Sequence, residues 1–127
     1  WRRYWRNDDA LLRSEVGSPG ASSANIINKY GCPWDYPLPW WDEHDTFILE
    51  YGRNKQNLEE YIVWSQKRQA EMLGFIAESC KRRFPSCGGI IIWMGHDAFP
   101  CAANTSILDF EGEYKPAALA LKKIFCN

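Results

Sequence analysis

The chain has 127 residues, of which 46% are hydrophobic and 24% are charged, and its formal net charge is -1. This composition is ordinary for one globular domain and argues against a disordered chain. Acidic and basic residues are interleaved, so we expect no cationic face that would bind nucleic acid or an anionic membrane surface. No window approaches the roughly 18 consecutive apolar residues that a membrane-spanning helix needs.

The sequence opens with WRRYWRNDD, without an initiating Met and without the basic and apolar regions of a secretory signal. We therefore expect it to be an excised piece of a longer protein. The cysteines are odd in number and form no Cys-x-x-Cys pair, which argues against a zinc knuckle or a complete disulfide framework. Mostly free and often buried thiols are expected. These residues are Cys32, Cys80, Cys87, Cys101 and Cys126.

The first predicted element is a short strand, DALL, that ends near Ser14 and is followed by Glu15 and a Gly/Pro-rich turn. In α/β barrels the loops after the carboxyl ends of the strands form the active site, so this position favours a functional carboxylate. Glutamate is also common on protein surfaces, where it is solvated or paired with a cation. Local sequence leaves both roles of Glu15 open.

Residues 15–57 form a connection of about forty residues without a clear periodic pattern, and connections of this length are usually functional. The segment contains GCPWDYPLPWWDEHD, in which aromatic residues alternate with prolines and acidic residues. Its aromatic rings could pack the loop against the body of the protein or stack against the C–H faces of a sugar. Packing is the expected role for most of them. The aromatic residues are Trp34, Tyr36, Trp40 and Trp41.

Residues 57–84 carry the clearest helix signal, with Asn57 as the N-cap, acidic residues in the first turn, basic residues in the last turn and Pro85 beyond. Gly88 and Gly89 then lead into IIIWM, a β-branched run typical of a strand buried on both faces of a parallel sheet. Pro116 begins a second helix. The predicted order is strand, helix, strand, helix, and the first three elements form a β-α-β unit.

The motif WMGHDAFPC begins at the end of the second predicted strand. Trp93 stands just before a loop, which favours a ligand surface. His96 and Asp97 would lie close to Glu15 if the two strands are parallel neighbours. A metal site built from His44, His96, Asp97 and Cys101 lacks ligand spacing, so we expect neither a metal nor another cofactor. A Ser-His-Asp hydrolase is not indicated, since no GxSxG motif occurs.

Several motifs, in their order and spacing, resemble the last quarter of the catalytic barrel of glycoside hydrolase family 2. They are LLRSEVGSPG, the loop tryptophans with WWDEH, the helix with QKRQAE, and GGIIIWMGHDAFPCAANTSILDFEGEYKPAALALKKIF. Within that family the sequence is more similar to the β-mannosidase and exo-β-glucosaminidase branch. The resemblance covers nearly the whole chain.

The resemblance implies that residues 1–127 are the C-terminal part of a (β/α)8 TIM barrel, an α/β fold. It makes Glu15 the nucleophile at the end of the seventh barrel strand and Trp93 a wall of the sugar subsite. It also implies retaining hydrolysis, in which a second carboxyl acts as acid and base. In the family this partner is a Glu preceded by Asn, and the present sequence contains no Asn-Glu pair. The other residues expected to contact substrate are Trp40, Trp41, His96 and Asp97.

Four positions depart from the family pattern. Val16 replaces an aromatic residue after the nucleophile, Met94 replaces Gln, His96 replaces Asn, and Phe99 replaces a loop Trp. A thioether and an imidazole in place of amides change the hydrogen bonds available to sugar hydroxyls. A preference for mannosides therefore does not follow from the resemblance.

We thus expect a fragment of a retaining exo-β-glycosidase that carries the nucleophile, lacks the acid/base and is inactive or nearly so alone. Its expected partners are a β-glycoside substrate and the rest of the parent glycosidase chain, and an extracytoplasmic location is favoured. Two other interpretations stay open. The chain could be a non-catalytic carbohydrate-binding or scaffold module that uses the aromatic loop, or a structural domain whose aromatic residues are all core.

Overall fold

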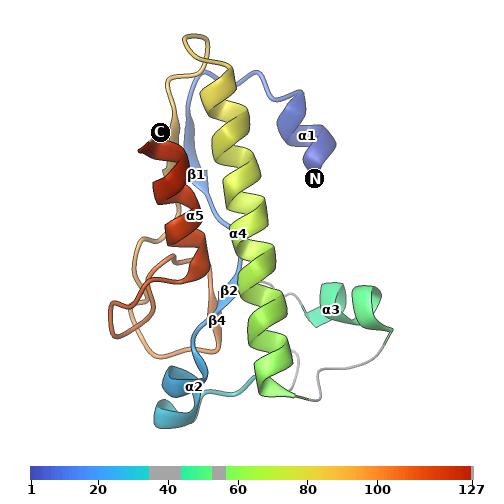
Figure 1. Cartoon of the computed structure of the whole chain (residues 1–127), viewed down its shortest axis with the longest axis vertical. Helices are drawn as coiled ribbons and strands as arrows, with labels where there is room; N and C mark the ends of the chain where they lie inside the picture. The colour runs from blue at the N-terminus through green and yellow to red at the C-terminus, as the bar shows by residue number, and fades with distance from the viewer. Residues whose placement is uncertain (35–43, 53–56, 127) are drawn as a thin grey trace.

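The computed structural model describes residues 1–34, 44–52 and 57–126, and Figure 1 shows their arrangement. The fold is mixed α/β, with a parallel two-stranded sheet, β1–β3, and an antiparallel two-stranded sheet, β2–β4. None of the helices in these ranges is long and apolar enough to cross a membrane. In chain order the elements are α1 (Arg2–Arg6), β1 (Arg13–Val16), β2 (Gly20–Ala21), α2 (Ala24–Tyr30), α3 (His44–Tyr51), α4 (Leu58–Arg82), β3 (Ile90–Ile92), β4 (Ala103–Asn104) and α5 (Pro116–Phe125).

Helix α4 confirms the prediction for residues 57–84 and ends two residues earlier. The side chain of Asn57 accepts a hydrogen bond from the Glu60 backbone N–H at 3.1 Å, which satisfies one of the free donors at the helix start. Acidic residues occupy the first turn and basic residues the last, as the helix dipole favours. In Figure 1 this 25-residue helix runs along most of the molecule, and α5 packs beside it.

Strands β1 and β3 are parallel neighbours joined through α4, which confirms the predicted order of strand, helix, strand, helix. The first strand begins later than predicted. It spans Arg13–Val16, whereas Leu11 and Leu12 of DALL are exposed. Pairing of β1 with β3 begins where the Arg13 backbone N–H donates to the Gly89 carbonyl at 3.2 Å. Glu15 therefore lies within β1, near its carboxyl end.

The main core lies between the β1–β3 sheet and the two helices α4 and α5. Leu73 and Ile76 of α4 are buried there against Val16 of β1. Ala117 and Leu121 supply the contribution of α5. The helices thus cover one face of the sheet, in agreement with the apolar stripe of the 57–84 segment.

The prediction that IIIWM is buried on both faces is wrong for this chain. Ile90 and Ile92 are half-buried and pack against the core, but Ile91 between them is 55% exposed. Side chains alternate between the two faces of a strand. Within the described residues, α4 and α5 cover only one of those faces, so Ile91 is left on the other.

The long connection after Glu15 contains more regular structure than its sequence indicated. Helix α2 begins after Ser23, whose hydroxyl accepts from the Ile26 backbone N–H at 3.3 Å, and it ends at Gly31, which has a left-handed φ of 65°. Helices α2 and α3 have seven and eight residues, which is too short for a clear helical period of apolar residues in the sequence. Trp34 stacks on Tyr61 with a centroid distance of 6.3 Å, which confirms a packing role for this tryptophan. Trp40 and Trp41, like Tyr36, lie outside the described residues.

All five cysteines are free thiols and three of them are buried, which agrees with the prediction of mostly free and often buried thiols. The buried ones are Cys32, Cys80 and Cys87, and Cys126 is exposed. Burial raises the pKa of the half-buried Cys101 thiol to about 12. This shift disfavours the thiolate, the form that reacts with electrophiles or binds metals.

Candidate functional site

Glu15 projects from the sheet on the side opposite to the helices. Its neighbour Val16 is only 2% exposed and belongs to the core against α4 and α5. The pairing of β1 with β3 is irregular between Arg13 and Val16, and Glu15 is exposed, so its side chain points away from that core. Its carboxylate has no hydrogen-bond or ion-pair partner within the part of the chain that the structure describes.

Trp93 follows β3 directly and lies beside the end of β1. Its backbone N–H donates to the Val16 carbonyl at 2.9 Å, which joins the carboxyl ends of the two strands. Trp93 is 46% exposed, and Ile91, two residues before it, is exposed as well. The uncovered face of the β1–β3 sheet thus carries Glu15, Ile91 and Trp93, a carboxylate beside apolar and aromatic surface.

The backbone at this edge is closely packed. A Cβ on Gly17 would lie 3.3 Å from the Cβ atoms of Trp93 and Thr105, so the segment after Glu15 passes against these two side chains. Met94 has a φ of 63°, a left-handed conformation that is unusual for any residue other than Gly, Asn or Asp. The chain therefore turns sharply just after Trp93. Unusual backbone conformations of this kind cluster at functional sites.

Asp97 occupies the interior of the fold, with no exposed surface. Its carboxylate accepts from the hydroxyls of Ser106 and Ser22, the latter at 3.3 Å, and forms an ion pair with Lys115. The carboxylate is thus enclosed by these partners, and the expected role of Asp97 in substrate binding stays a prediction. His96 is exposed, and its backbone pairs with that of Leu108.

Lys115 is the second charged residue of this interior cluster and is 2% exposed. Its ammonium lies 3.3 Å from an Asp97 carboxylate oxygen and donates to the Ser106 hydroxyl and the Gly20 carbonyl at 3.1 Å each. Burial lowers the pKa of Lys115, and the neighbouring Asp97 carboxylate opposes that shift. The ammonium is held in the interior because an anion and two further acceptors compensate its lost hydration.

Helix α4 directs polar side chains into the core that were not predicted from the sequence. Gln69 is fully buried and donates to the carbonyls of Ser18 and Ser106 at 2.9 Å each. Ser65, one turn earlier, accepts from the Ala21 backbone N–H at 2.9 Å. The sequence signal for them is that Ser65 and Gln69 lie four residues apart on the apolar face of the helix. These side chains anchor the segment that follows Glu15.

Two of the residues considered for a metal site, His96 and Asp97, have different surroundings. Asp97 is engaged by Lys115 and two serines, while His96 is exposed. Across residues 1–34, 44–52 and 57–126, no three His, Cys, Asp or Glu side chains are placed to hold a metal ion.

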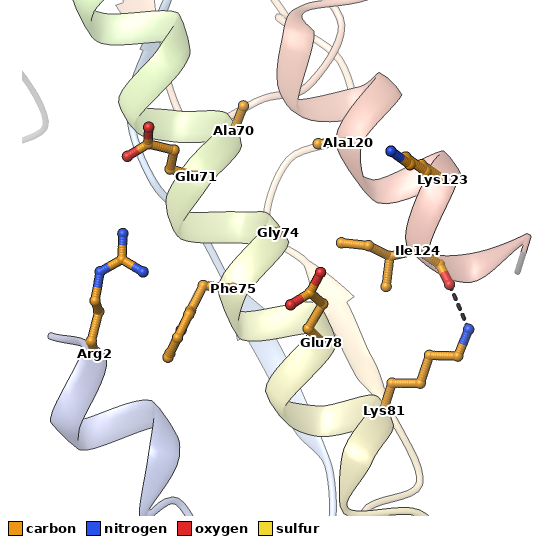
Figure 2. Close-up of a pocket in the computed structure, with 10 residues that line it drawn as sticks. All are labelled: Arg2, Ala70, Glu71, Gly74, Phe75, Glu78, Lys81, Ala120, Lys123 and Ile124. Atoms are coloured by element: carbon orange, nitrogen blue, oxygen red, sulfur yellow. Dashed lines mark hydrogen bonds between the residues drawn. The ribbon is translucent and has the colours of Figure 1, made fainter.

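A groove of about 560 Å³ lies along the outer side of α4, between α1 and α5 (Figure 2). Phe75 forms part of its lining. The ring of Phe75 is already in contact with other groups, because Trp1 packs against it edge-on and the Arg2 guanidinium lies over it. On the other side, Lys81 donates to the Ile124 carbonyl at 2.6 Å. The lining does not include Glu15 or Trp93. Its charges are of both signs, which gives no preference for an anion or a cation.

Curated proteins that are similar in sequence to this chain are β-mannosidases. Beta-mannosidase B from Aspergillus terreus is 30% identical over 82 residues, which cover 62% of this chain and 10% of the relative. The Beta-mannosidase B proteins of Emericella nidulans and Aspergillus niger match with the same identity and coverage. The chain thus spans about a tenth of the length of the curated relatives it matches. No family model matches the sequence.

A solved structure shares the fold of the chain. The crystal structure of beta-D-mannosidase from Dictyoglomus thermophilum superposes with a TM-score of 0.77 at 23% identity, covering 98% of this chain and 17% of the other. At this identity the superposition shows a common fold. Together the matches confirm the resemblance to β-mannosidase-like glycoside hydrolases that the sequence motifs indicated.

Proposed function

We propose that this chain, which resembles β-mannosidase-like glycoside hydrolases, is the C-terminal part of a (β/α)8 catalytic barrel of a retaining exo-β-glycosidase, with Glu15 as the nucleophile. The observation that carries the proposal is the position of Glu15 and Trp93 at adjacent strand ends, on the sheet face that α4 and α5 leave open. In a (β/α)8 barrel the helices cover the outside of the sheet and the carboxyl ends of the strands form the active site. The arrangement of β1, α4, β3 and α5 is consistent with both features.

The chemistry follows from the carboxylate. Glu15 would attack the anomeric carbon and form a glycosyl ester while the bond to the leaving oxygen breaks. A second carboxyl about 5.5 Å away would protonate the leaving oxygen and then accept a proton from the water that hydrolyses the ester. Trp93 would pack its indole against the C–H face of the sugar and orient it. Neither step needs a metal or an organic cofactor.

The acid/base carboxyl is proposed to come from another part of a longer protein. In the resembling family that residue follows an Asn, and the chain has no Asn-Glu pair. Glu15 would then supply half of the catalytic pair, and the chain alone would be inactive or nearly so. Because the matched relatives are named β-mannosidases, a β-mannoside is the first substrate to test.

The test uses the full-length protein encoded by the gene that contains this sequence. Nitrophenyl β-mannoside and a panel of other nitrophenyl β-glycosides would be offered to the wild type, to Glu15→Gln and to Glu113→Gln. Glu113 is an exposed carboxylate and serves as the matched control. Loss of the nucleophile should reduce kcat at least about 10³-fold, by analogy with nucleophile removal in other enzymes, whereas the control should keep its rate.

Binding of the sugar separates the enzyme from a carbohydrate-binding module. If the proposal holds, Glu15→Gln loses turnover but still binds the product sugar, as measured by quenching of tryptophan fluorescence. Full activity of Glu15→Gln would refute the nucleophile assignment. Sugar binding by a wild-type protein that hydrolyses none of the glycosides would favour the binding module instead.

A further inference from the structure

The two segments that leave the proposed active site are joined by hydrogen bonds and an ion pair in the interior of the fold. One segment follows Glu15 and includes Gly20 and Ser22. The other follows Trp93 and includes Asp97. The Ser22 hydroxyl donates to the Asp97 carboxylate at 3.3 Å, and both residues have no exposed surface. This side-chain bond adds to the backbone pairing of β2 with β4, which also joins the two segments.

Lys115 makes a second link between the same segments. Its ammonium donates to the Gly20 carbonyl of the first segment at 3.1 Å and forms an ion pair with Asp97 of the second at 3.3 Å. The lysine immediately precedes α5, whose first residue is Pro116, and its backbone N–H donates to the Ile107 carbonyl at 2.9 Å. The ammonium is thus fixed to the scaffold and reaches both segments.

The segments also touch next to the proposed catalytic residues. Gly17, two residues after Glu15, packs so closely on Trp93 that a Cβ there would lie 3.3 Å from the Trp93 Cβ. A shift of the segment at Gly20 or at Asp97 would therefore be transmitted to Gly17 and Trp93. Among the contacts described above between the two segments, all within the described residues, only the Asp97–Lys115 ion pair joins two charged side chains.

We propose that Asp97 and Lys115 are a positioning pair, which holds the segments after Glu15 and Trp93 together and so sets the placement of the nucleophile relative to the sugar platform. The inference rests on the proposed function, since it concerns the efficiency of attack by Glu15. In this proposal both residues act through the two segments rather than on the substrate itself. Their contribution is geometric, and a displacement of about 1 Å can lower the rate of an enzyme about 10²-fold.

The experiment compares kcat, KM and thermal stability in the full-length protein. Lys115→Met leaves the buried Asp97 without its cation and could destabilise the fold, so Asp97→Asn/Lys115→Met is the main variant, because it removes both charges. Ser22→Ala is a milder variant that removes one cross-link and keeps the ion pair. Lys81→Met is the matched control, since it also removes a lysine that donates to a carbonyl, that of Ile124.

A 2-fluoro glycosyl fluoride supplies a readout that a purely structural role would not move. Its covalent adduct forms through attack by the nucleophile, and intact mass follows its rate. We expect the neutral double variant to keep a melting temperature near that of the wild type, with its KM unchanged and its kcat and adduct rate lowered about 10²-fold. Ser22→Ala should lower both rates several-fold, and Lys81→Met should leave them unchanged.

The outcomes separate the two proposals. Wild-type kcat and adduct rates in the double variant and in Ser22→Ala, with Glu15→Gln inactive, would overturn the positioning pair and leave the proposed function standing. Equal losses of kcat and stability in every variant, the control included, would also overturn it. Full activity of Glu15→Gln would overturn the proposed function and the positioning pair together.

Discussion

Replacing Gln69 tests how strongly α4 holds the segment that follows Glu15 in the chain. The Gln69 side-chain amide donates to the carbonyls of Ser18 and Ser106 at 2.9 Å each, in a site with no solvent exposure. Gln69→Leu keeps the size and the helix propensity of the side chain but leaves both carbonyls without this donor. An unsatisfied buried polar group costs about 1–3 kcal/mol, so two of them cost about 2–6 kcal/mol in the free energy of unfolding. The variant also removes the Gln69 Oε1, which is buried without a hydrogen-bond partner among the described residues, and this offsets about 1–3 kcal/mol, so we expect a net loss of about 2 kcal/mol.

Gln66→Leu is the matched control, one turn away on the same helix. Its amide donates to a single carbonyl, that of Ala21, at 3.1 Å, and the side chain is half-buried. Water can replace this donor, so we expect a loss of about 0.5–1.5 kcal/mol. Urea denaturation followed by far-UV circular dichroism gives both values. The reasoning is refuted if Gln69→Leu costs less than about 1 kcal/mol or no more than Gln66→Leu.

Three further predictions concern other parts of the chain. Hydrogen bonding to Arg13 lowers the pKa of Asp8 in the folded protein. The stabilisation by the Asp8 carboxylate is therefore complete above the unfolded pKa of 3.8 and is lost as the pH falls through the lower folded pKa. Asp8→Asn should destabilise the fold at pH 7 and make the melting temperature less dependent on pH in the acid range. Cys126, which is exposed, should react with iodoacetamide at pH 8 well before Cys101, whose pKa burial raises to about 12, and peptide mass spectrometry should detect this order. Gly20→Ala would place its Cβ inside the volume of the Gln69 amide and should cost about 1–3 kcal/mol in urea denaturation.

Local signals were sufficient to predict the elements that position the candidate site. The cap at Asn57 and the charges at the two ends mark α4 within two residues of its observed end, because these interactions are made within the helix itself. The β-branched run before Trp93 marks β3. Parallel pairing of β1 and β3 then follows from the helix between them, and it brings the ends that carry Glu15 and Trp93 together.

The interior polar contacts could not be predicted because their partners are distant in sequence. Gln69 bonds Ser18, 51 positions away, and Lys115 bonds Gly20, 95 positions away. A buried lysine looks like a surface lysine until the anion that compensates it is known. For the same reason the sequence does not show that the Asp97 carboxylate has Ser22, Ser106 and Lys115 as partners.

The wrong prediction for β3 bears on the proposed barrel. Ile90, Ile91 and Ile92 have the composition of a strand buried on both faces, yet Ile91 is 55% exposed because the helices cover only the opposite face. Parallel sheets are almost always covered on both faces, and in a (β/α)8 barrel the inner face is filled by side chains from the other strands. The mismatch between the apolar sequence of β3 and its exposure therefore supports the proposal that further strands of a barrel would enclose this face. Glu15 and Trp93 share that face, near the carboxyl end where a barrel opens to substrate, so enclosing it would complete the core and the active site together.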